Sequence, residues 1–156
     1  MSTNALRFMS LLFTALVTGA SLAHLLELPN KIKQPGPDYL VVQQIYRGWS
    51  HFGVVLLGAI VTNLALTIAL RNRRAAFWFA FSAFILVTAT LAIFLVWTYP
   101  ANQATNNWTV VPGNWQQLRT QWEYSHAANA LLTFAAFCSV VVAALKSKAQ
   151  TPAPRF

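Results

Sequence analysis

Charged residues are scarce in this chain. They make up 9% of its 156 residues, whereas hydrophobic residues make up 56%. An average soluble domain carries about 25% charged residues. Only three residues are acidic and only three are histidine. This scarcity argues against an ordinary soluble domain and predicts that long apolar stretches lie in a lipid bilayer.

Cysteine is almost absent as well. The single cysteine, Cys138, lies inside an apolar stretch. One chain can therefore build neither a disulfide framework nor a cysteine metal site. The formal net charge of +8 forms no basic face, because lysine and arginine fall at the ends of apolar segments. We therefore expect no nucleic-acid partner.

Four apolar segments approach the roughly 20 residues that are needed to cross the hydrocarbon core of a bilayer. They cover about residues 8–28, 49–70, 75–99 and 122–145. Pro29 is expected to end the first of them. The run Ser21-Leu22-Ala23 resembles a signal-peptide cleavage site, but the apolar stretch continues to Leu28, which favours an uncleaved helix. The sequence thus predicts an all-α integral membrane four-helix bundle, with residues 1–156 as a single domain.

Positive charges are distributed unequally between the two ends of the predicted spans. Seven of the eleven lie on one side. These are Arg7, Arg71, Arg73, Arg74, Lys146, Lys148 and Arg155. The other four are spread over two longer loops. By the positive-inside rule, the first side faces the cytoplasm, so both termini are expected there. The expected location is the bacterial inner (plasma) membrane.

Aromatic residues mark the opposite side. The span ends beside the two long loops carry Trp49, Trp97, Tyr99 and Trp122. Such positions are typical of an aromatic belt at the membrane interface. In the first long loop, Tyr39, Val42 and Tyr46 recur at helical spacing, which predicts a short interfacial helix before the second span.

Five of the six acidic and histidine residues fall near the outer ends of the predicted spans. His24 and Glu27 are three residues apart, as are Glu123 and His126, and His51 opens the second span. Residues three apart share a helix face, so each pair can direct two ligand atoms at one point. Imidazoles and carboxylates suit iron, copper, zinc or manganese, and di-iron bundles use the same Glu-x-x-His spacing. The five residues predict a transition-metal site.

Each of these residues also has a structural interpretation. His51 could face water, and Glu123 could cap the N-terminus of the fourth helix. Glu27 could form an ion pair with Arg47 or Arg119. A metal-free polar network is therefore one alternative to the metal site. Haem is another, with two histidines as axial ligands and Arg47 or Arg119 holding the propionates.

Three further residues are predicted to act beside the metal. Tyr46 could donate to a bound oxygen species, and Arg47 could hold an anionic or polar group of the substrate. Asn129 lies three residues after His126 on the same face, where it could contact a substrate or support a ligand. Tyr46 could equally belong to the aromatic belt.

Pro100 and Asn102 follow the third span, and Trp122 and His126 open the fourth. With the four-span layout, these residues resemble the anthrone-oxygenase-like family of small four-helix membrane proteins, long classed as a domain of unknown function. The resemblance covers most of the chain. It implies oxidation of a phenolic or other aromatic compound with molecular oxygen.

Together, the metal site and the resemblance predict a metal-dependent membrane oxidoreductase that acts on a lipophilic or aromatic substrate. The alternative is a non-enzymatic accessory subunit of a membrane complex, or a small transporter, in which the polar cluster only holds helices together. The expected partners are the lipid bilayer and a lipophilic small molecule. A membrane protein or a second copy of the chain is a further candidate partner.

Overall fold

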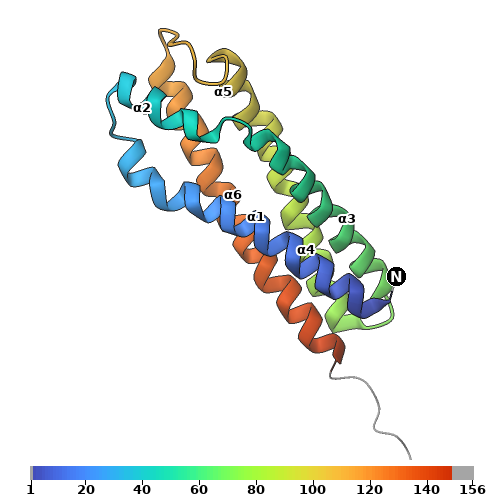
Figure 1. Ribbon diagram of the computed structural model, residues 1–156. Coiled ribbons are helices and arrows are strands. Elements are labelled where there is room, and N and C mark those ends of the chain that lie inside the picture. The colour runs from blue at the N-terminus through green and yellow to red at the C-terminus, as the bar shows by residue number, and fades with distance from the viewer. Residues whose placement is uncertain (1, 149–156) are drawn as a thin grey trace, which may run out of the picture.

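The chain folds into an elongated helical bundle, shown in a computed structural model that describes residues 2–148 (Figure 1). Its α-helices are α1 (Thr3–Lys31), α2 (Gly36–Gln43), α3 (Gly53–Ala69), α4 (Arg74–Ile93), α5 (Tyr99–Ala104) and α6 (Trp115–Lys148). Three short turns complete them: the 3₁₀ turns η1 (Gln44–Tyr46) and η2 (Trp49–Phe52), and the π-helical turn η3 (Phe94–Thr98). The described residues form no strand, which confirms the predicted all-α fold.

Four helical stretches are long and apolar enough to cross a membrane. They are Thr3–Lys31, Trp49–Ala69, Arg74–Ala104 and Trp115–Ser147. Each contains or closely matches one predicted span, and the chain is a multi-pass membrane protein. Three of the stretches extend beyond the prediction at the end that carries α2 and α5. The reason is that hydropathy detects the apolar part of a helix and not its polar turns outside the hydrocarbon core.

Pro29 does not end α1, so this prediction was wrong. Proline removes the hydrogen bond that its own N–H would donate to the carbonyl of Leu25, and its ring crowds that carbonyl, which can kink a helix without ending it. The chain stays helical through Lys31, and the N–H of Ile32 donates to the carbonyl of Leu28 at 3.0 Å. The additional turn places Lys31 one turn beyond Glu27 on the same helix face.

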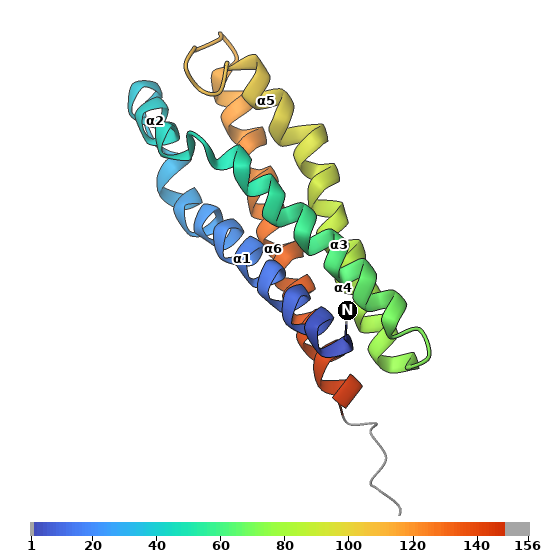
Figure 2. The ribbon, with the colours of Figure 1, turned by 45° about the vertical axis from the view of Figure 1, so that its right-hand side comes forward.

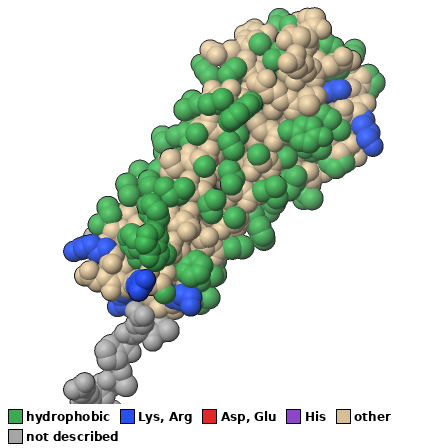
Figure 3. Space-filling model, turned by 180° about the vertical axis from the view of Figure 1, so that it is seen from behind, with side chains coloured by type: hydrophobic (Ala, Val, Ile, Leu, Met, Phe, Trp, Pro, Cys, Tyr) green, Lys and Arg blue, Asp and Glu red, His purple; other side chains and the backbone are tan. Residues whose placement is uncertain are grey.

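The start of α1, the turn between α3 and α4, and the end of α6 lie together at one end of the bundle (Figures 1 and 2). There the guanidinium groups of Arg7 and Arg73 both donate to the carbonyl of Ser147. Arg155, from the predicted cytoplasmic group, lies outside the described residues. Figure 3 shows Lys and Arg side chains at the two ends of one face, with hydrophobic and uncharged side chains between them. This pattern is the one expected of a membrane-spanning bundle.

Small residues let the helices pack closely. Ala76, Ala80 and Ala83 on α4 are buried against Val140 and Ala143 of α6. Association of membrane helices depends on such close packing, because lipid tails are as apolar as leucine. The packing of α6 against both α1 and α4 places its polar N-terminal half between them.

Gly58 allows α1 to lie close to α3. A Cβ atom added at this position would come within 2.8 Å of the Phe13 ring. We expect Gly58→Ala to lower the free energy of unfolding by about 1–3 kcal/mol, the usual cost of overpacking. Gly19→Ala on α1 is the matched control, because nothing lies within 4 Å of the added atom there. Thermal unfolding in detergent measures both variants, and equal stability would contradict the close contact.

The predicted short helix in the first long loop is present as α2, followed by η1. Tyr39 and Gln43 on α2 are buried, and Tyr39 packs in a cluster with Trp108, Leu118 and Trp122. The α2–η1 segment therefore docks on the bundle by one face and covers its end between α1 and α6 (Figures 1 and 2).

Candidate functional site

A cavity of about 950 Å³ lies inside the end of the bundle that α2 and η1 cover. Helices α1, α3 and α6 and the α4–η3 segment contribute its walls. Its deeper part is apolar, with Val17, Leu56 and Phe94 among the lining residues. His24 and His126 line the same cavity. Its size suits a small organic molecule of several rings.

The two imidazoles stack on each other. The ring centroids of His24 and His126 are 4.1 Å apart, and the ring planes differ by 26°. Trp122 lies 4.1 Å from His126 and 5.3 Å from His24, and Tyr46 lies 4.6 Å from His24, all between ring centroids. The Nδ1 atom of His24 is buried and has no hydrogen-bond partner. The pair is therefore enclosed by aromatic rings and retains an unused polar atom.

Lys31 lies beside this pair, between the two carboxylates. Its Nζ atom is 3.1 Å from Oε1 of Glu123 and 3.9 Å from Oε2 of Glu27, and it donates to the Tyr46 hydroxyl at 2.9 Å. Lys31 is 3% exposed and Glu123 is 1% exposed. The ammonium also lies 4.4 Å from the ring centroid of Tyr46 and 4.5 Å from that of Trp122. One cation thus compensates the buried carboxylate and joins α1 to α6.

Two phenols complete this network. The Tyr39 hydroxyl donates to Oε1 of Glu123 at 2.9 Å and accepts from the Gln43 amide, and the Tyr46 hydroxyl donates to Glu27. Burial, followed by the nearby Glu123 charge, raises the pKa of Tyr39 well above its usual range. Burial and the hydrogen bond to Glu27 raise the pKa of Tyr46 similarly. Both phenols therefore stay protonated and hold α2 and η1 against the bundle as donors.

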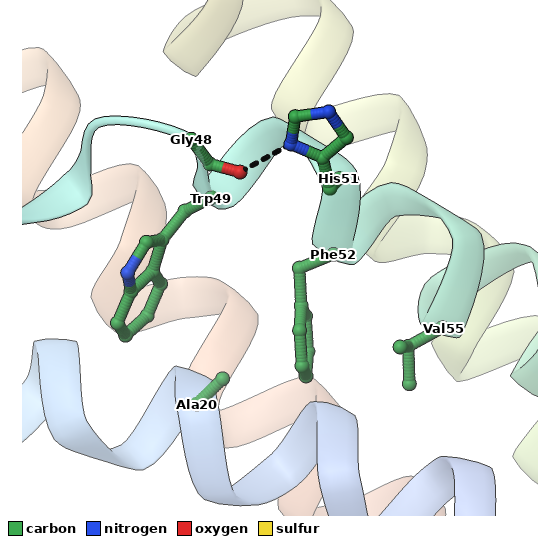
Figure 4. Close-up of a pocket in the computed structure, with 6 residues that line it drawn as sticks. All are labelled: Ala20, Gly48, Trp49, His51, Phe52 and Val55. Atoms are coloured by element: carbon green, nitrogen blue, oxygen red, sulfur yellow. Dashed lines mark hydrogen bonds between the residues drawn. The ribbon is translucent and has the colours of Figure 1, made fainter.

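Four of the five predicted metal ligands are near one another, and His51 is not. His51 is exposed, and its Nδ1 atom is 2.8 Å from the carbonyl of Gly48 (Figure 4). Within residues 2–148, no group of three or more His, Cys, Asp or Glu side chains is placed to hold a metal ion. Each carboxylate uses one oxygen in its contact with Lys31, and Oε2 of Glu123 is buried without a hydrogen-bond partner. A metal ion bound by the five residues stays a prediction. Of the five, His24 and His126 line the cavity and are the side chains that could bind a metal ion there.

The structural interpretations of single residues are also resolved. Glu123 does not cap a helix, because α6 begins at Trp115, more than two turns earlier. Glu27 pairs with Lys31, whereas the Arg119 guanidinium donates to the carbonyl of Gln34 at 2.7 Å. The histidine rings stack face to face, whereas the axial ligands of one haem direct ring nitrogens at the iron from opposite sides.

The three residues predicted to act beside the metal all line the cavity. Asn129 is buried, and its Oδ1 atom has no hydrogen-bond partner. The Tyr46 hydroxyl donates its hydrogen bond to Glu27 and accepts one from Lys31. Its proton is therefore used within the network, whereas the sequence prediction had it donated to a bound oxygen species. Arg47 is exposed and donates to the Gln44 side chain. Of the three, Asn129 has a buried polar atom without a hydrogen-bond partner, which a bound molecule can satisfy.

Trp122 is not a belt residue. It is 3% exposed, and its indole N–H donates to Oδ1 of Asn102 at 2.9 Å. The same oxygen accepts from the indole N–H of Trp108 at 3.1 Å. Asn106, Asn107 and Trp108 all have positive φ, a conformation that non-glycine residues rarely adopt, and all three line the cavity. Asn102 thus holds a strained turn against α6 at the roof of the cavity.

Sequence reasoning did not identify Lys31 as part of the site. A signal was available, because Lys31 is four residues after Glu27 and seven after His24, on one helix face. The expected helix end at Pro29 removed Lys31 from that face. Tyr39 and Gln43 gave no comparable signal, because Tyr39 donates to Glu123, 84 residues further along the chain, and Gln43 joins the network only through Tyr39.

Comparison with known proteins returned no relative: no family model matches the chain, and neither does any curated protein or solved structure. The resemblance to the anthrone-oxygenase-like family stays a prediction from the residues that carry it.

Proposed function

We propose that this chain is a membrane oxidoreductase whose cavity binds a lipophilic, aromatic small molecule beside His24 and His126. The observation that carries the proposal is the cavity itself, whose lining surface is mainly apolar and includes the two imidazoles and the Asn129 amide among its polar groups. Two of these groups have a buried polar atom without a partner, His24 Nδ1 and Asn129 Oδ1. A hydroxyl group on the ligand would donate a hydrogen bond to an unpaired acceptor, and the ligand's rings would pack against the apolar lining.

In this proposal the histidine pair exchanges a proton with the substrate hydroxyl. Removing that proton turns a phenol into a phenolate, which gives up electrons to molecular oxygen, the proposed oxidant, more readily than the phenol does. Asn129 holds the substrate oxygen in place, and the Trp122 ring stacks beside the reacting part. A transition metal bound at the two histidines would supply oxygen activation or electron transfer. The proposed location is the bacterial inner membrane with cytoplasmic termini, in line with the charged end formed by Arg7 and Arg73.

Ligand binding tests the proposal at the cavity wall. Leu56 lines the cavity, whereas Leu64 on the same helix faces outward and is exposed. We expect detergent-purified protein to bind 1-naphthol, and Leu56→Trp to weaken binding by about tenfold or more, because the larger ring fills the cavity. Leu64→Trp should bind as the wild type does. Calorimetry measures both, and equal binding by the two variants would contradict the proposed site.

Elemental analysis on the same samples, prepared without chelators, addresses the metal. Stoichiometric metal that is lost in His126→Ala and kept in His51→Ala supports the metal-dependent form of the proposal. Naphthol binding by metal-free protein supports a form in which the histidines act as proton acceptors alone.

A second candidate function is a non-enzymatic accessory subunit. The observation that favours it is that Lys31 pairs with both carboxylates, so that the charges of the network compensate one another. In that case the polar network serves only to hold α1, α2 and α6 together. A folded wild type that binds no lipophilic phenol and no metal would favour this candidate over the oxidoreductase.

A further inference from the structure

A second, smaller hollow of about 370 Å³ lies between α1 and the η2–α3 segment (Figure 4). It is lined by Ala20, Gly48, Trp49, His51, Phe52 and Val55. Figure 4 shows the Trp49 and Phe52 rings extending from η2 toward the Ala20 methyl group on α1, while His51 points the other way. The hollow is thus a gap between two helices whose sides are aromatic rings and small groups.

The hollow adjoins the main cavity. Ala20, Gly48, Trp49 and Phe52 line both spaces, so the rings of Trp49 and Phe52 form the partition between them. Val55 lines the smaller hollow and not the main cavity.

The partition has open space on one side. A Cβ atom added at Gly48 or Gly53 would meet nothing within 4 Å, and Trp49 is 42% exposed. Gly48 has a φ of 87°, which lets the chain turn sharply before η2. The Trp49 ring packs edge-on against His24 and Tyr46 on one side only, and its exposed part leaves the space into which the ring would turn.

The helix rise places one side of the hollow, formed by Ala20 and Val55, at the depth of the hydrocarbon core. Ala20 is 13 residues from Arg7, which corresponds to about 20 Å along a helix. Val55 is 16 residues from Arg71, or about 24 Å. Both residues therefore lie within a hydrocarbon core about 30 Å thick that begins at the arginine-rich end. Trp49 is 22 residues from Arg71, or about 33 Å by the same rise, and so lies at the far edge of that core. The hollow therefore opens to the acyl chains next to the membrane interface.

We propose that this hollow is a lateral portal through which a lipophilic molecule passes from the bilayer into the main cavity, with the Trp49 and Phe52 rings as its gate. The inference rests on the proposed function, since it needs a ligand in the main cavity. It adds the route of entry. A molecule dissolved in the acyl chains reaches the histidine pair without crossing the polar roof formed by Asn106 and Asn107.

Binding kinetics in proteoliposomes test the portal. Val55→Phe fills the hollow without adding atoms to the main cavity, and Val54→Phe is the matched control, because Val54 is 72% exposed on the same turn. Quenching of tryptophan fluorescence by 1-naphthol in a stopped-flow instrument gives both rate constants. We expect Val55→Phe to lower the association and dissociation rates by about tenfold each and to leave Kd unchanged, since a gate alters rates and not affinity. Phe52→Ala, which removes a gate ring, should raise the association rate.

Three outcomes would overturn the portal. Unchanged rates in both Val55→Phe and Phe52→Ala would mean that the ligand enters elsewhere, while the cavity and the proposed function stand. A weaker Kd with an unchanged association rate in Val55→Phe would make the hollow part of the binding site instead. Absence of naphthol binding by the folded wild type would reject the proposed function, and the portal with it.

Discussion

Replacing Lys31 by methionine should lower the free energy of unfolding of the bundle by about 3–5 kcal/mol, because it leaves the buried Glu123 carboxylate without its cation. Methionine keeps the length of the side chain, so the loss reports the charge and its hydrogen bonds rather than a cavity. Glu27 contributes less to the loss, since its side chain is 38% exposed and partly solvated. Chemical unfolding in detergent micelles, followed by circular dichroism, measures the change.

Two further variants separate the ion pair from general damage. Lys33→Met, two residues along on an exposed position, should leave stability within about 0.5 kcal/mol of the wild type. Adding Glu123→Gln to Lys31→Met should recover much of the loss, because the double variant has no unpaired buried charge. A double variant as unstable as Lys31→Met alone would show that the ammonium acts mainly through its contacts with the aromatic rings.

Replacing His24 or His126 by alanine should reduce oxidation of a lipophilic phenol by about 100-fold or more, the usual contribution of a positioned proton acceptor. Oxygen uptake by proteoliposomes that contain a panel of lipophilic phenols measures the rate. The two histidines should act as one unit, because their rings stack at 4.1 Å. The variant that lacks both should therefore be little worse than either single variant.

His51→Ala is the matched control for the histidine pair. His51 is exposed and bonds only within its own segment, so its loss should leave the rate within about twofold of the wild type. A large loss in His51→Ala together with full activity in His126→Ala would contradict the proposed site. Equal losses in all three single variants would instead favour the metal site of the sequence prediction, in which His51 is a ligand.

Local patterns in the sequence were sufficient for the architecture. A hydropathy window of about 20 residues detects each span. The grouping of Arg7, Arg71 and Arg73 at one end of the bundle follows from where the charges fall between the spans. The pairs His24 with Glu27 and Glu123 with His126 also follow from local spacing, because residues three apart always share a helix face. These predictions need no knowledge of how the helices pack.

The outer ends of the helices were less predictable. Pro29 was expected to end α1, and the fourth span was expected to begin at Trp122 rather than at Trp115. Beyond the hydrocarbon core a helix turns polar and hydropathy no longer marks it, so its continuation depends on tertiary contacts. The error at Pro29 mattered most, because it removed Lys31 from the site.

The sequence alone determined that this protein is a four-span membrane bundle with its histidines and glutamates near one end, because hydrophobicity and helical spacing act over short segments. Only the tertiary structure decided which of those side chains meet. In the folded chain, His24 stacks on His126, and both carboxylates pair with Lys31. Trp122 is buried, whereas His51 is exposed and lies apart from the other histidines. A buried charge takes the partner that packing brings within about 4 Å, and that partner is set by the relative positions of helices far apart in the chain.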